Sequence, residues 1–75
     1  MIKNAAIKYK EKIFTGNSHY SILEKNKFLY DKDYIEGFIT DKNIFVDRRE
    51  AAKIAFDCKQ IKIKINSLFS YNINF

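Results

Sequence analysis

The chain has 75 residues, which is enough for a single domain over residues 1–75 and no more. One cysteine excludes an internal disulfide, and one histidine with one cysteine excludes a structural zinc site. The net charge of +5 favours anionic partners such as nucleic acid, nucleotides or an acidic protein surface.

Small size makes self-association the expected source of additional stability. A domain of this length buries only about 60–65% of the surface that its unfolded chain exposes, and disulfides and metals are already excluded. The chain is 47% hydrophobic and 16% aromatic, which leaves apolar side chains for a contact between copies. All but two of the 14 basic residues are lysines, which lack the bidentate geometry of arginine. The positive charge can therefore equally be a solvated, lysine-rich face.

The first part of the chain predicts a hairpin followed by a helix. Residues 5–9 and 12–15 are rich in apolar side chains and predict two strands, with a turn at residues 10–11 between them. Ser18 is suited to cap a helix that runs from His19 to about residue 30.

A second hairpin followed by a helix start has the clearest local pattern. Residues 37–40 and 44–46 are β-branched and aromatic, and the polar residues 41–43 between them suit a tight loop. Asp47 then stands where a helix N-cap belongs, with Glu50 three positions later, which is the spacing of a capping box.

The last third predicts a helix and two further strands. The helix covers residues 48–58, and its apolar stripe repeats at i, i+3, i+4 and i+7. The residues of this stripe are Ala51, Ile54, Ala55 and Cys58. Residues 60–65 alternate isoleucine with lysine and predict a half-buried strand. Residues 68–75 alternate again and are expected either to add a strand or to cover a neighbouring subunit. The fold class is therefore α+β: a small antiparallel sheet built from two hairpins and a C-terminal strand, packed with two helices.

Few residues are suited to catalysis or metal binding. His19 stands beside Ser18, but adjacent residues at a helix start do not face one another, so a nucleophile–base pair is not expected. Cys58 fits a small core residue better than a reactive thiol. The cluster of Asp31, Asp33 and Glu36 fits turn residues better than a metal site. With only two glycines there is no glycine-rich phosphate loop. The expectation is a protein that is not an enzyme and has no catalytic residue, metal or cofactor.

Arg48 and Arg49 form the one arginine pair, at the start of the second predicted helix. Guanidinium groups next to the free N–H groups of a helix start make a natural anion site. Asp47 opposes this role because its carboxylate already satisfies those N–H groups. An ordinary capped helix with two arginines in solvent is the structural alternative.

Several segments together resemble a family of small phage proteins whose best-understood members are Thoeris anti-defence proteins of the sponge type. The segments are residues 4–7, 12–16, 19, 37–40, 45–52, 54–55, 60–61 and 68–70. The resemblance implies a homo-oligomer that sequesters cyclic nucleotide immune signals without destroying them. It also implies a base stacked on Phe38, a polar contact from Asp47 and a basic contact from Lys62 or Lys64. Asp47 departs from the family pattern, in which an amide would suit phosphates better, and lysine replaces a guanidinium.

The leading hypothesis is accordingly a phage anti-defence protein that binds a cyclic nucleotide signal through Phe38, Asp47, Arg48, Arg49, Lys62 and Lys64. The alternative is an anti-CRISPR-type inhibitor whose partner is a bacterial defence effector protein, such as a nuclease or its nucleic-acid channel. A third interpretation is a nucleic-acid-binding accessory protein that uses Lys62 and Lys64. The sequence has no signal-peptide pattern and no apolar run of membrane-spanning length, so the expected location is the cytoplasm of a bacterial host cell.

Overall fold

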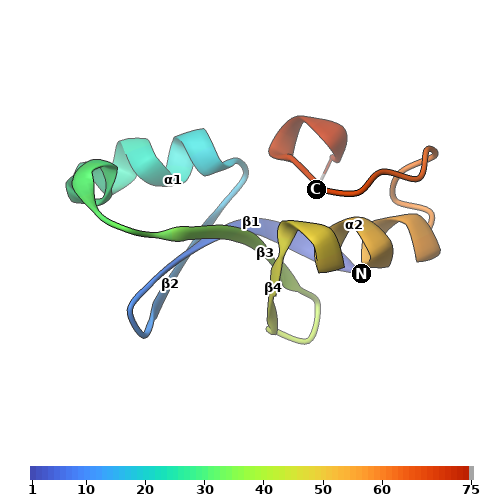
Figure 1. Ribbon diagram of the computed structural model, residues 1–75, viewed down its shortest axis with the longest axis horizontal. Helices are drawn as coiled ribbons and strands as arrows, with labels where there is room; N and C mark the ends of the chain where they lie inside the picture. Colours follow the sequence, from blue (N-terminus) through green and yellow to red (C-terminus); the bar gives the residue numbers. More distant parts are fainter. Residues whose placement is uncertain (75) are drawn as a thin grey trace.

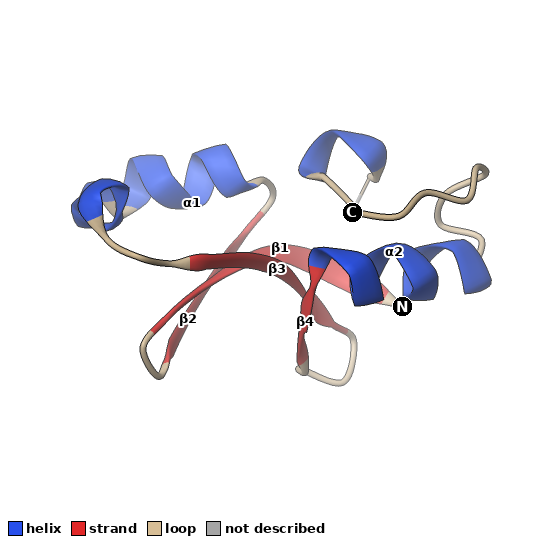
Figure 2. Ribbon diagram, viewed as in Figure 1, coloured by secondary structure: helices blue, strands red, loops and turns tan. Residues whose placement is uncertain are grey.

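A four-stranded antiparallel sheet with the strand order β2-β1-β3-β4 forms the centre of the protein. The computed structural model describes residues 1–74. Its elements are β1 (Ile2–Tyr9), β2 (Lys12–Gly16), α1 (His19–Lys25), the 3₁₀ helix η1 (Lys27–Asp31), β3 (Ile35–Thr40), β4 (Phe45–Asp47), α2 (Arg48–Asp57) and the 3₁₀ helix η2 (Ser70–Asn72). Both helices and the C-terminal segment, which is residues 58–74 after α2, lie on one side of the sheet (Figures 1 and 2). The predicted α+β class is confirmed.

Both predicted hairpins are present. Lys10, in the turn between β1 and β2, has φ 56°, and Asn43, in the loop between β3 and β4, has φ 62°. These are left-handed conformations that tight loops require. The Thr40 hydroxyl closes the second loop by accepting hydrogen bonds from the backbone N–H groups of Lys42 and Ile44, at 3.3 and 3.2 Å. β1 and β3 pair with each other and join the two hairpins into one sheet.

The core lies between the sheet and the helices. Residues directly opposite each other on antiparallel strands point to the same face, so the register assigns Ala5, Ile7, Phe38 and Val46 to the helix side. These four side chains are buried, together with core residues from the other elements. The latter are Ile22, Leu23, Leu29, Ala51, Ala52, Ala55, Ile61, Leu68 and Ile73.

Helix α1 begins as predicted but ends earlier. The Ser18 hydroxyl accepts a hydrogen bond from the Ser21 N–H at 3.0 Å, which confirms the predicted cap. The helix ends at Lys25 instead of near residue 30. Asn26 has left the helical conformation, at φ −134°, and its side-chain amide donates to the Ile22 carbonyl at 2.9 Å. This local side-chain bond competes with helix continuation, and η1 follows.

Helix α2 is capped by Asp47, as predicted. The Asp47 carboxylate accepts a hydrogen bond from the Glu50 N–H at 2.8 Å. Ala51 and Ala55 are buried and Ile54 is half-buried, but Cys58 is exposed, so its place on the buried stripe was wrong. The helix already ends at Asp57, which removes Cys58 from the helical periodicity.

The two predicted C-terminal strands are not formed. Lys59 takes φ 62°, and the N–H groups of Gln60 and Ile61 both bond the Ala55 carbonyl, so the chain reverses directly after α2. The isoleucine alternation then fails to give one buried face, because Ile61 is 9% exposed whereas Ile63 is 74% exposed. Residues 68–74 contain η2 and no strand, and Phe75 lies outside the described residues.

The C-terminal segment packs on its own chain. Leu68 and Ile73 are buried in the core. Leu68 is held from both sides by one residue, since its N–H bonds the Arg48 carbonyl at 2.9 Å and its carbonyl accepts from the Arg48 guanidinium at 2.8 Å. These apolar side chains are therefore already covered within the chain. No helix within residues 1–74 is long and apolar enough to cross a membrane.

Candidate functional site

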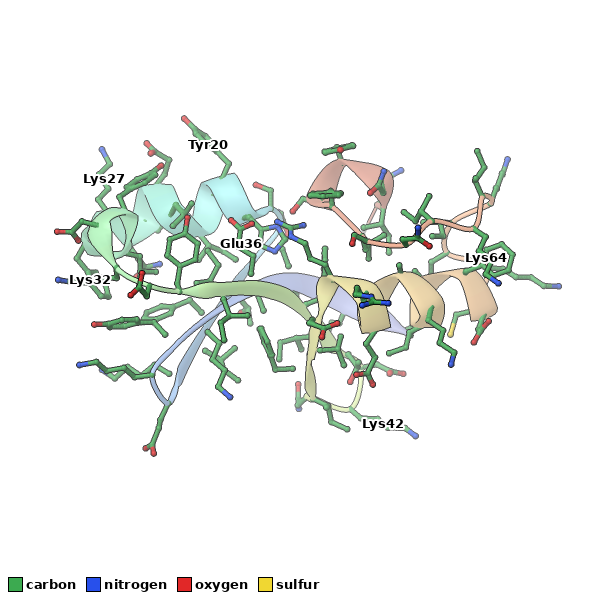
Figure 3. All side chains as sticks on the ribbon, viewed as in Figure 1. Tyr20, Lys27, Lys32, Glu36, Lys42 and Lys64 are labelled. Carbon is green, nitrogen blue, oxygen red and sulfur yellow. The ribbon has the colours of Figure 1, made fainter. Side chains whose placement is uncertain are left out.

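A groove lined by basic and aromatic side chains lies between α2 and the C-terminal segment. Its volume is about 320 Å³. We call it the basic groove; its lining residues are Arg49, Ala52, Lys53, Phe56, Asp57, Lys64, Ile65 and Asn66. Figure 3 shows Lys64 beside the C-terminal end of α2. Two residues predicted to bind a ligand, Arg49 and Lys64, thus line the same groove although they are distant in sequence.

Helical spacing places the first wall of the basic groove. Arg49, Lys53 and Phe56 stand at i, i+4 and i+7 on α2, so they lie along one side of the helix. The chain reversal at Lys59 returns Lys64 to this side. Phe56 is 37% exposed, which leaves part of its ring open to a ligand.

The basic groove is electrostatically suited to an anion. Three cations, Arg49, Lys53 and Lys64, and one carboxylate, Asp57, give it a net charge of +2. Within residues 1–74 none of the three cations forms an ion pair. Their charges are therefore available to a bound phosphate or carboxylate, whereas Asp57 opposes an anion placed next to it.

Phe38 and Asp47 lie away from the basic groove. The Phe38 ring is 0% exposed and makes an edge-to-face contact with the His19 ring, with 5.0 Å between centroids. A base could stack on it only if the residues that cover it moved away. Asp47 uses one carboxylate oxygen to cap α2. Neither residue lines the basic groove.

Arg48 and Lys62 also lie outside the basic groove. The Arg48 guanidinium pairs with the Glu36 carboxylate, donates to the Leu68 carbonyl and lies over the Phe69 ring at 4.3 Å. It therefore holds the C-terminal segment in place. Lys62 lines a separate hollow of about 360 Å³. The predicted pairing of Lys62 with Lys64 does not place the two ammonium groups in one groove.

Sequence reasoning missed Lys53, Phe56 and Asn66 as lining residues. The i, i+4, i+7 spacing of Arg49, Lys53 and Phe56 was the signal that could have found two of them. Asn66 could not be found this way, because its position depends on the chain reversal at Lys59.

A second hollow, of about 370 Å³, is lined by Ser18, His19, Tyr20, Arg48, Phe69, Ser70 and Tyr71. Here His19 contacts a serine distant in sequence. The His19 Nε2–H donates to the Gly37 carbonyl at 2.7 Å, which leaves Nδ1 to accept from the Ser70 hydroxyl at 2.6 Å. The same hydroxyl accepts from the His19 backbone N–H at 3.1 Å. These bonds tie the C-terminal segment to α1 and β3.

Protein stability should fall as the pH is lowered from about 7 to about 5. Burial lowers the pKa of His19 below its ordinary value of 6.5. The unfolded state therefore binds more protons in this range, so the contribution of neutral His19 is complete above pH 6.5 and is lost as the pH falls toward the lowered pKa. Thermal unfolding followed by circular dichroism at several pH values measures this effect.

The His19→Gln variant is the control for this pH dependence. His19 is the one histidine of the chain, so the variant should lose most of the change in melting temperature between about pH 7 and pH 5. An unchanged slope in the variant would show that another group causes it.

A comparison with protein families gives a match over almost the whole chain. Residues 1–73 match the model of a family described as phage T4 y16D protein. No curated protein and no solved structure matches the chain. The match extends over the whole sheet, both helices and the basic groove.

Proposed function

The chain belongs to the phage T4 y16D protein family, and we propose that it is an anti-defence protein that binds a cyclic nucleotide signal in the basic groove and withholds it without chemical change. Because the family is a phage family, the protein would act inside an infected bacterium. The resemblance to sponge proteins supports the ligand class. One observation carries the proposal: three cations that form no ion pair within residues 1–74 line the same groove as a partly exposed aromatic ring.

The chemistry of the basic groove suits a nucleotide. Phosphate groups would contact Arg49, Lys53 and Lys64, and a base would lie against the exposed part of Phe56. Base stacking on an aromatic side chain contributes roughly 1–3 kcal/mol. The volume of about 320 Å³ lies at the lower end of the range for small-molecule sites. Sequestration requires binding alone, and this arrangement supplies charge and a stacking surface.

Removing either of the two predicted cations of the basic groove, Arg49 or Lys64, should weaken nucleotide binding strongly. A hydrogen bond to a charged group contributes roughly 1.5–3 kcal/mol, so Arg49→Ala and Lys64→Ala should each raise Kd by about tenfold or more. Isothermal titration of the unmodified protein against cyclic ADP-ribose isomers and cyclic di- and trinucleotides identifies the ligand first. Titration of the two variants then tests the site, and the loss of affinity should shrink at high salt.

Lys42→Ala is the matched control. Lys42 lies in the loop between β3 and β4, on an exposed site outside the basic groove, so this change lowers the net charge equally without touching the site. If Lys42→Ala weakened nucleotide binding equally, net charge alone would explain the effect, and the groove assignment would be contradicted. Mass spectrometry of the ligand after heat release should recover it intact. No binding across the whole panel would contradict the proposal and favour direct inhibition of a defence protein.

A further inference from the structure

An aromatic pocket lies at the end of the molecule that the β1–β2 turn and η1 form. Its volume is about 560 Å³, and its lining residues are Tyr9, Lys10, Glu11, Lys12, Phe14 and Phe28. We call it the hairpin pocket. The β1–β2 turn lies at one end of the molecule, and α2, which carries the basic groove, lies at the other (Figure 1). The hairpin pocket is therefore a separate site.

The strand register and η1 bring three aromatic rings together in the hairpin pocket. Tyr9 lies two positions after the buried Ile7, and Phe14 is paired with Ile7, so both rings are on the helix side of the sheet. The centroid of the Phe28 ring, from η1, lies 6.5 Å from that of Tyr9 and 6.0 Å from that of Phe14. Its plane is inclined by 71° and 68° to theirs, so neither ring lies flat on Phe28.

Phe28 has ring surface available to a ligand, since it is 53% exposed. The neighbouring Leu29 is fully buried and attaches η1 to the core, so the Phe28 ring is not required for that contact. A single exposed aromatic residue is ordinary on a protein surface, but here three rings share one cavity. A flat apolar group can therefore enter the hairpin pocket and lie against Phe28.

Two lysines flank the Tyr9 ring. The Lys10 ammonium group lies over this ring, 5.4 Å from its centroid, and Lys12 is directly opposite Tyr9 on β2. Within residues 1–74 neither lysine forms an ion pair. Glu11 is the one carboxylate of the lining in this part of the chain, which leaves the pocket with a net charge of +1. The hairpin pocket thus combines aromatic surface with adjacent positive charge.

We propose that the hairpin pocket binds single-stranded nucleic acid, with one base against Phe28 and the adjacent phosphates near Lys10 and Lys12. The lining within residues 1–74 consists only of aromatic and charged side chains. Single-strand sites use this combination to stack bases and to attract the backbone. The bases of a duplex are already paired and stacked, so an unpaired base enters at lower cost. This proposal does not depend on the cyclic nucleotide ligand of the basic groove.

A nucleic-acid strand suits the hairpin pocket better than an acidic protein segment does. Aspartate and glutamate have no flat ring to place against Phe28, whereas every base has one. Carboxylates are matched best by the bidentate geometry of arginine, and the lining found within residues 1–74 contains lysines instead. Because stacking accepts any base, we expect little dependence on the nucleotide sequence.

Fluorescence anisotropy with a labelled oligothymidylate of about 10 nucleotides tests the proposal on the full chain. This length lies within the range of about 4–16 nucleotides for known single-strand sites. At physiological salt the Kd should lie between about 1 and 100 µM, as for other non-specific complexes. Two phosphate contacts predict a slope of about −1.4 when the logarithm of the association constant is plotted against that of the salt concentration.

Two substitutions test the two parts of the hairpin pocket. Phe28→Ala should raise the Kd by about fivefold or more, which is the effect of losing one stacked base. Lys12→Ala should make the salt slope shallower by about 0.7, because one phosphate contact is lost. Lys12 is chosen instead of Lys10 because the Lys10 ammonium group packs on the Tyr9 ring, so its removal would also change the aromatic surface. Lys12→Ala also tests the site if Phe28→Ala fails to fold.

Tyr71→Ala is the matched control for Phe28→Ala, because Tyr71 is 84% exposed and lies outside the hairpin pocket. This variant should bind the oligothymidylate like the unmodified protein. Equal weakening by Tyr71→Ala would overturn the proposal, and so would an unchanged salt slope in Lys12→Ala. No binding by the unmodified protein, or equally tight binding of a duplex of the same length, would also overturn it.

The remaining outcomes separate the hairpin pocket from other partners and from the basic groove. If a glutamate-rich peptide bound in a Phe28-dependent way and the oligothymidylate did not, the pocket would belong to an acidic protein and the proposal would be wrong. Arg49→Ala should retain the oligothymidylate, and Phe28→Ala should retain any cyclic nucleotide. Loss of the oligothymidylate in Arg49→Ala alone would place the strand in the basic groove and overturn the proposal.

Discussion

Gly37→Ala should be among the most destabilising single-methyl additions in this chain. Gly37 lies in β3, opposite Asp47 of β4. A Cβ atom at this position would lie 2.2 Å from the Val46 carbonyl oxygen and 2.6 Å from the Phe45 Cζ atom. The Val46 oxygen belongs to the backbone of the paired strand, so relief requires β4 to separate from β3. We expect a loss of about 3 kcal/mol or more in the free energy of unfolding, measured by urea denaturation.

Gly16→Ala is the control for this prediction. A Cβ atom there would lie 2.9 Å from the Ile22 Cγ1 atom and 3.2 Å from the Ser21 hydroxyl, both of which belong to side chains and not to the backbone of a paired strand. Neither glycine has a positive φ, so backbone conformational preference does not distinguish the two sites. We expect a loss of about 1 kcal/mol for Gly16→Ala. Equal losses for both variants would show that β4 accommodates the methyl group.

The sequence predicted the elements that depend on neighbouring residues. The loop at residues 41–43 and the cap at Asp47 are specified within a few positions, and both form as expected. Each hairpin follows from apolar runs that flank a polar turn, and the β1–β3 pairing then joins the hairpins. Local patterns therefore sufficed for the sheet and for the start of each helix.

The C-terminal third depends on partners distant in sequence. The Gln60 side chain bonds both the N–H and the carbonyl of Ile2, at 2.7 and 2.8 Å, and so takes the place that a strand backbone would have. Isoleucine–lysine alternation favours a strand only where a free sheet edge is near, and here Lys59 turns the chain away. Nothing within residues 60–65 themselves encodes this chain reversal.

The candidate site could likewise be predicted from the sequence only in part. Arg49 was identified from the helix start, and Lys64 from a strand that does not form, yet the chain reversal brings both to one groove. Phe38 was chosen for its aromatic ring, but its position on the helix side of the sheet buries it. Alternation within a strand cannot by itself say which of its two faces is covered.

Leu68→Ala should cost about 2–5 kcal/mol in the free energy of unfolding, as truncations of fully buried leucines do. Leu68 is 0% exposed, and its backbone is fixed by two hydrogen bonds to Arg48. A 75-residue domain has a total stability of roughly 4–11 kcal/mol, so the loss is a large fraction of it. Urea denaturation of the variant measures the effect.

Ile63→Ala is the matched control for Leu68→Ala, because it also shortens a large aliphatic side chain of the C-terminal segment. At 74% exposure, Ile63 should lose no more than about 0.5 kcal/mol. Leu68 also fixes the segment that carries Lys64 and Asn66 to the basic groove, so Leu68→Ala should weaken nucleotide binding under conditions in which the variant is still folded, whereas Ile63→Ala should not. Similar unfolding free energies for the two variants would mean that the C-terminal segment contributes little to the core and that the basic groove lacks a fixed second wall.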